Sequence, residues 1–208
     1  MNRRLILSLI GISPLALISL KIPTNNDPIL DILIKRWKKS KEYTLAVFEA
    51  MPEDDIEYRP SNEQLSFVQH FMHLSLVNNF YMGILTDSKT YKDFYALIEA
   101  DFLVSRPDEI NLFQPDYLEK RGSNTNKDLV SKYVADTFDY VISSLDKIND
   151  EILTKGIHKE KPEFLSGHTN LDLILRGESH TAHHRSQAIA YLRMNGIRPP
   201  GYTSNNKL

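Results

Sequence analysis

Two histidines near the C-terminal end of the chain, His180 and His184, have the type and spacing needed to hold a metal ion. On an α-helix, side chains four residues apart lie on one face, one turn from each other, so both imidazoles can reach a single ion. The same face carries four apolar or small residues: Leu173, Gly177, Ala188 and Tyr191. It is therefore expected to point into the protein. His183 projects about 100° away from His184 and is expected at the rim of the site or behind the ligands.

A third ligand is needed, because a metal centre with room for a substrate usually takes three protein ligands and a water. His73, midway along the inward face of an earlier predicted helix, is the best candidate. His70 lies one turn before it and is the competitor. His158 and His168 fall in a connection and at a helix start, so both are expected to be solvated.

The composition narrows the chemistry further. The chain contains no cysteine, which excludes a disulfide, a thiolate metal site and a cysteine nucleophile, and leaves nitrogen and oxygen ligands for a metal. The formal net charge is −2, and the sequence shows no basic stripe with interleaved aromatic residues. A nucleic-acid partner is therefore not expected.

Four long helices should position these histidines, because apolar residues recur at helical spacing over four stretches of the chain. The stretches are 28–51, 62–85, 127–148 and 170–194. A less regular connection, with a short helix over 91–103, separates the second stretch from the third, and residues 151–166 form another irregular connection. Strand signals are nearly absent. The sequence predicts an all-α four-helix bundle with a long connection between helices 2 and 3, a fold in which metal sites are built on facing helices.

The first residues are predicted to be an export signal. Arg3 and Arg4 precede an uncharged run, residues 5–20, that is short for a membrane span, and a basic start before such a run is typical of export signals. The arginine pair also loosely resembles a twin-arginine signal. Residues 1–24 are thus predicted to be the signal and 25–208 the bundle domain of an exported, periplasmic bacterial protein. An uncleaved membrane anchor, or an apolar first helix on a cytoplasmic protein, stays open.

The last predicted helix and its tail resemble the C-terminal signature of the DinB-like (DinB/YfiT) superfamily. Residues 179–202 read SHTAHHRSQAIAYLRMNGIRPPGY; in that family a His-x-x-x-His pair precedes Arg-Gly-Gln, Tyr-Leu-Arg and an Asn-Gly-x-x-Pro-Pro tail. Two shorter stretches, 48–54 and 58–60, resemble the end of the family's first helix and the loop after it. Ser66-Phe67 followed by His73-Leu74 resembles the second-helix segment that bears its first metal histidine.

The resemblance covers roughly residues 28–202 and implies a four-helix bundle with a divalent metal held by three histidines. These fall on His73, His180 and His184, the trio that the helix faces also favour. One departure is Ser186, where the family commonly has glycine. Ser186 could narrow the helix packing or add a hydroxyl near the site, and it removes no ligand. Three imidazoles suit zinc, nickel, iron or manganese.

A divalent ion held by three neutral imidazoles keeps open positions, so the sequence predicts a metal-dependent hydrolase of a small-molecule substrate. The alternatives are a metal-dependent thiol S-transferase, which the family resemblance suggests, and a metal-binding bundle without catalysis. Export would favour hydrolysis, because small thiols are chiefly cytosolic. Three polar residues lie near the ligands without an assigned role as catalytic base: Glu178, Gln187 and Tyr191.

The connection between the second and third helices is rich in aromatic residues. They could form a substrate lid, a surface for a homodimer, or ordinary cover for the core. The residues are Tyr91, Phe94, Tyr95, Phe102, Phe113 and Tyr117.

Overall fold

The computed structural model describes residues 28–107, 127–156 and 163–202 of the chain. Over this part the fold is built from helices, and the all-α class predicted from the sequence is confirmed. Four of the helices are long: α1 (Pro28–Glu49), α2 (Phe67–Thr86), α4 (Lys127–Leu145) and α6 (Asn170–Met194). The short elements are η1 (Glu53–Asp55), α3 (Phe94–Ile98), α5 (Asp150–Thr154) and η2 (Glu163–Leu165).

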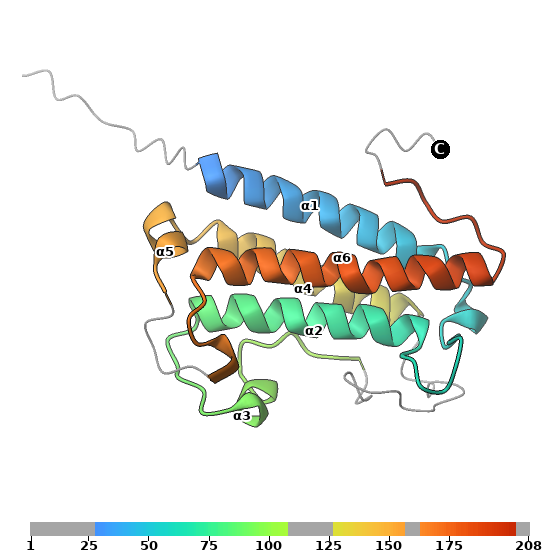
Figure 1. Cartoon of the computed structure of the whole chain (residues 1–208), viewed down its shortest axis with the longest axis horizontal. Helices are drawn as coiled ribbons and strands as arrows, with labels where there is room; N and C mark the ends of the chain where they lie inside the picture. Colours follow the sequence, from blue (N-terminus) through green and yellow to red (C-terminus); the bar gives the residue numbers. More distant parts are fainter. Residues whose placement is uncertain (1–27, 108–126, 157–162, 203–208) are drawn as a thin grey trace, which may run out of the picture.

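The long helices form a bundle in which α1 and α6 run in one direction and α2 and α4 in the other (Figure 1). Around the bundle, α2 packs extensively on both α6 and α4, and α1 packs on α4; the contact between α1 and α6 is the least extensive of the four. Because α2 and α4 are neighbours that point the same way, the chain must return along the bundle between them. This explains the long connection between these two helices.

Local signals set the ends of the two helices that carry the histidines. Ser66 caps α2: its hydroxyl accepts from the backbone N–H of Gln69, whose side chain accepts in turn from the backbone N–H of Ser66. Thr169 caps α6 through the backbone N–H of Asp172. Beyond the end of α6, Gly196 adopts a φ of 71°, a left-handed conformation that glycine reaches without steric cost.

The core is filled by large apolar side chains from all four long helices. Among the described residues, the fully buried aromatic side chains include Trp37, Phe48, Phe67, Phe71 and Phe138. Gly177 allows α6 to come close to the opposing helices, because a β-carbon there would lie 3.2 Å from Oδ1 of Asn78 and 3.5 Å from the ring of Trp37. This close approach lies one turn before His180, so it helps to set the distance between α6 and α2 at the histidines.

Three segments predicted from the sequence differ in detail in the structure. The second helix starts at Phe67 rather than at residue 62, because the backbone of Ser66 is extended and caps the helix. The short helix predicted over 91–103 covers only Phe94–Ile98. The connection 151–166 contains two short elements, α5 and η2, that are too brief to produce a periodic pattern.

The aromatic residues of the long connection divide into two groups where the structure describes them. Tyr91 is buried, and Phe94 and Phe102 pack against the core. Tyr95 is exposed. Phe113 and Tyr117 lie outside the described residues, as do His158 and the predicted export signal 1–24. Among the helices that are described, none is both long and apolar enough to cross a membrane.

Candidate metal centre

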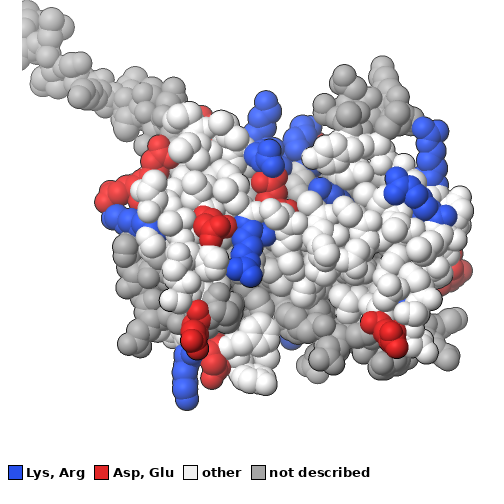
Figure 2. Space-filling view, in the orientation of Figure 1, with Lys and Arg blue, Asp and Glu red and all other residues white. Residues whose placement is uncertain are grey.

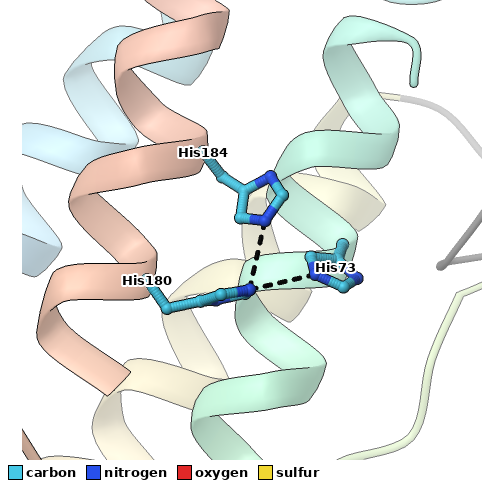
Figure 3. Close-up of side chains that lie close together, drawn as sticks. All are labelled: His73, His180 and His184. Atoms are coloured by element: carbon cyan, nitrogen blue, oxygen red, sulfur yellow. Dashed lines mark hydrogen bonds between the residues drawn. The ribbon is translucent and has the colours of Figure 1, made fainter. Parts of the chain in front are cut away.

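Three imidazoles converge between α2 and α6 (Figure 3). His73 projects from α2, and His180 and His184 project from α6, one turn apart. Nε2 of His180 lies 3.1 Å from Nε2 of His73 and 3.1 Å from Nε2 of His184. One ring nitrogen from each residue lies within 4.8 Å of the others. The structure thus brings together the three histidines that the sequence predicted as ligands.

The spacing of these nitrogens fits a shared cation. A metal–imidazole bond measures about 2.0–2.1 Å, so two ligand nitrogens on one ion lie about 2.9 Å apart at a right angle and about 3.4 Å apart at a tetrahedral angle. The two observed separations of 3.1 Å fall inside this range. Three nitrogen donors and no thiolate also suit a borderline divalent ion. The three-histidine cluster can therefore bind a metal ion.

Burial keeps imidazoles of the site neutral, which a metal ligand requires. Desolvation, together with repulsion from His73 and other neighbouring histidines, lowers the pKa of His180 to about 4 and that of His184 to about 2. The pKa of His70 falls to about 4 for the same two reasons. At neutral pH the lone pairs of His180 and His184 are thus available to a cation rather than occupied by a proton.

A chain of hydrogen bonds behind the cluster orients His184. Its Nδ1 lies 2.9 Å from Nδ1 of His70, and Nε2 of His70 lies 3.3 Å from the hydroxyl of Tyr191. The Tyr191 hydroxyl donates to the carbonyl oxygen of Leu65 at 3.2 Å. All of these groups are on the side of the His184 ring away from its Nε2.

The carbonyl oxygen of Leu65, the last acceptor in this series of hydrogen bonds, determines the tautomers of His70 and His184. A carbonyl oxygen can only accept, so the Tyr191 proton points to Leu65 and the phenol oxygen accepts from Nε2–H of His70. Nδ1 of His70 then accepts from Nδ1–H of His184. This leaves Nε2 of His184 without a proton and facing His180, which is the tautomer that binds a metal.

His70 therefore supports a ligand instead of competing to be one. Its side chain is buried, at 1 % exposure, and both ring nitrogens have partners on the far side of His184. The sequence left His70 as the competitor of His73 because both lie on the inward face of α2. Tyr191 offered a usable signal: it follows His184 by seven residues, two helical turns along the same face.

Neither His183 nor His168 belongs to the cluster, although the ring of His183 packs edge to face against that of His184, with centres 5.0 Å apart. His183 is exposed, with Nε2 2.7 Å from the side-chain amide of Gln187. His168, at the start of α6, contacts Asp172 and Arg176. The expectation that His183 lies at the rim agrees with its exposure.

Two further residues of α6 point away from the cluster. Glu178 is turned towards α1, where it forms an ion pair with Arg36 at 2.6 Å. The Ser186 hydroxyl donates to the carbonyl oxygen of Ala182 at 2.7 Å on the exposed side of the helix. Ser186 thus neither narrows the helix packing nor adds a hydroxyl to the site.

About one helical turn from the histidines, a hydrogen-bonded pair of polar side chains also joins α2 to α6. The side-chain amide of Asn78 donates to the hydroxyl of Thr181 at 2.7 Å, and both side chains are buried. A buried hydrogen bond between two helices fixes their relative position, because either group alone would be costly to bury. This pair helps to hold His73 opposite His180, and no pattern in the sequence indicates it.

Comparison with known proteins agrees with this architecture. A family model described as the DinB superfamily matches residues 36–188, well over half of the 208-residue chain. The matched region includes His73, His180 and His184. The comparison with curated proteins gives no match.

Proposed function

The chain belongs to the DinB superfamily, and from this premise we propose that it is a metal-dependent hydrolase that acts on a small-molecule substrate. The observation that carries the proposal is the convergence of one ring nitrogen each from His73, His180 and His184. Zinc, nickel, iron and manganese are the candidate ions, because each accepts imidazole nitrogen.

Bound at three neutral imidazoles, a divalent ion would supply an activated water at neutral pH and polarise a carbonyl or similar group. The protein's own part is to present the donors. Burial keeps His180 and His184 unprotonated, and the hydrogen bond from His184 to His70 holds the His184 ring with Nε2 towards the other two histidines. Three protein ligands leave coordination positions for water and substrate, as catalytic sites require.

The proposal is tested by reconstituting the full chain. The protein is stripped with a chelator and reloaded separately with Zn²⁺, Ni²⁺, Fe²⁺ and Mn²⁺. Initial rates are then measured on chromogenic carboxylic esters, lactones, amides and phosphodiesters. We expect hydrolysis of one substrate class that depends on metal, is lost in His180→Ala and is retained in His183→Ala. His183 is the matched control because it is a histidine on the same helix turn that is not one of the three candidate ligands.

Two outcomes would overturn the proposal. Stoichiometric metal binding without hydrolysis of any substrate would indicate a metal-binding bundle without catalysis. Metal-dependent conjugation of glutathione to 1-chloro-2,4-dinitrobenzene, without hydrolysis, would indicate a thiol S-transferase instead.

A further inference from the structure

A second site lies on the opposite side of α6, in the groove between α1 and α6. The groove holds a pocket of about 340 Å³ lined by residues of both helices and by Tyr202. Of the four contacts between neighbouring long helices, the one between α1 and α6 is the least extensive. Figure 2 shows basic side chains gathered beside acidic ones over the middle of α1. A pocket of this size is at the lower end of the range for small-molecule sites.

Arg185 is the buried cation of this pocket. Its side chain is 7 % exposed, and its Nη1 donates to the hydroxyl of Thr44 at 2.9 Å, to the hydroxyl of Ser40 at 3.1 Å and to the carbonyl oxygen of Ser40 at 3.4 Å. The guanidinium also lies 4.8 Å from the ring centre of Tyr43. All of these partners are neutral.

The positive charge of Arg185 is thus not paired within the described part of the chain. Arginine stays charged in proteins, and a buried charge is costly unless it meets an opposite charge. The described contacts use Nη1, which leaves Nε and Nη2 for a ligand. Glu178 lies close enough to act on Arg185 electrostatically, but its carboxylate is bonded to Arg36 at 2.6 and 3.0 Å.

The charges at the rim leave the pocket positive. Four cationic side chains and two carboxylates line it. Arg36 pairs with Glu178, and Lys39 pairs with Glu42 at 2.6 Å. The other two cations of the pocket are Lys35, which is exposed, and Arg185, which is buried. One buried guanidinium matches a single carboxylate, which it can bind through two parallel hydrogen bonds.

We propose that the α1/α6 groove binds a small organic acid, with its carboxylate on Arg185 and its apolar part against Tyr43 and Tyr202. The two tyrosine rings meet edge to face, with centres 5.3 Å apart, and form an aromatic wall beside the guanidinium. Lys35 adds a second, weaker positive charge at the mouth of the pocket. The site is independent of the metal centre, since its residues come from α1, the outer face of α6 and the segment after α6.

The test is an NMR titration of the full chain with sodium benzoate, which carries one carboxylate on an aromatic body. We expect a saturable shift of the Arg185 Nε–H resonance and of the backbone amides of Ser40 and Tyr43. Benzyl alcohol, the neutral analogue, should leave the Arg185 resonance in place. Inorganic phosphate should bind more weakly than benzoate, because it has no apolar part to contact the tyrosines.

Substitutions locate the site. Arg185→Lys removes the planar guanidinium that can donate two parallel hydrogen bonds to a carboxylate, so benzoate binding should weaken about tenfold or more. Lys35→Glu should weaken it by about three- to fivefold, the size of a surface charge effect. Lys38→Glu is the matched control, because Lys38 is an exposed lysine of α1 that does not line the pocket; it should leave binding unchanged.

Three results would overturn the proposal. The first is the lack of a saturable shift with benzoate, or an equal shift with benzyl alcohol. The second is tighter binding of inorganic phosphate than of benzoate, which would replace the organic acid by a phosphate ligand. The third is equal weakening by Lys35→Glu and Lys38→Glu. Because both of these lysines are exposed, this comparison remains decisive even if Arg185→Lys fails to fold.

Discussion

The two sides of α6 carry opposite kinds of nitrogen group within less than two turns of the helix. Towards α2, His180 and His184 present neutral imidazoles; towards α1, Arg185 presents a cation. Burial acts on both, and it lowers the pKa of His180, His184 and Arg185 alike. The buried imidazoles are neutral at pH 7, so each has a nitrogen lone pair that can coordinate a cation. The guanidinium cannot do so, and it needs acceptors or an anion instead.

The helices packed on either side of α6 supply the hydrogen-bond partners that each kind of group needs. On the α2 side, His70 accepts the Nδ1 proton of His184 and so leaves its Nε2 free for a metal. On the α1 side, Ser40 and Thr44 supply oxygen atoms to Arg185. One helix can therefore carry a site suited to a cation on one face and a site suited to an anion on another. Each neighbouring helix completes the hydrogen bonds of the face that it covers.

The largest expected effect comes from removing a ligand on the α2 side. His73→Ala, His180→Ala and His184→Ala should each weaken metal binding by more than about 100-fold, the upper end of what loss of a supporting group costs. His183→Ala should bind like the wild type. Affinity is measured by competition with a chromophoric chelator, and folding by far-UV circular dichroism. Retained stoichiometry in any one of the three variants would remove that residue from the site.

Between pH 7 and pH 5, the stability of the metal-free protein should depend on pH through the histidines on the α2 side of α6 and not through Arg185. The pKa of His70 is about 4 in the folded protein against an ordinary value of 6.5, so the unfolded chain binds protons first as the pH falls. Stability should therefore drop below about pH 6.5 and keep falling to about pH 4. Between pH 7 and pH 5, His70 alone should account for about 2 kcal/mol.

Urea unfolding at pH 7 and pH 5, with chelator present, measures this loss. His70→Leu should reduce the difference between the two pH values. Arg185→Met should keep it, because arginine stays charged in both states over this range. A difference that is the same in His70→Leu as in the wild type would show that His70 is not buried in its neutral form.

Breaking the hydrogen-bond chain behind His184 should have a smaller effect than removing a ligand. His70→Leu leaves Nδ1–H of His184 without its acceptor, and we expect metal affinity to fall by about 10- to 100-fold. His70→Asn places an amide oxygen near the former Nδ1 and should recover part of the loss. The same chelator competition measures both variants. Wild-type affinity in His70→Leu would mean that the orientation of His184 does not depend on His70.

The smallest effect is expected from the α1 side. Arg185→Met removes the hydrogen bonds to Ser40 and Thr44 but also removes a buried charge, so the free energy of unfolding should change by about 1 kcal/mol or less. Metal affinity should not change. Denaturant unfolding and the chelator competition measure the two quantities. A tenfold loss of metal affinity would show that the two sides of α6 are coupled.

The sequence predicts most of the fold because apolar residues recur at helical spacing along its four long helices. The last helix was predicted over 170–194 and covers Asn170–Met194. The predicted start of the second helix is too early because residues 62–65, polar except for Leu65, do not break the periodic pattern. Only the extended backbone of Ser66 shows that they precede the helix. Five-residue helices such as α5 contain too few turns to give any pattern.

The sequence predicts only those features of the candidate site that depend on the geometry of single helices or on the resemblance to a family. The histidine trio was named from helix faces and from the resemblance to a family. The roles of His70 and Tyr191 depend on which ring nitrogen faces which partner, and spacing along one chain does not contain that information. The groove around Arg185 depends on how closely α1 and α6 pack, which is again a property of two helices and not of either one.

By itself, the sequence determined that His180 and His184 share one face, because 3.6 residues per turn place positions four apart on the same side of any α-helix. Only the tertiary structure decided which histidine of α2 meets them. His70 and His73 differ by about 60° around α2 and about 4.5 Å along it, so both face the interior. The rotation and axial position of α2 against α6 put His73 beside Nε2 of His180 and put His70 behind His184. That placement follows from packing between helices, through contacts such as the close approach at Gly177 and the Asn78–Thr181 hydrogen bond.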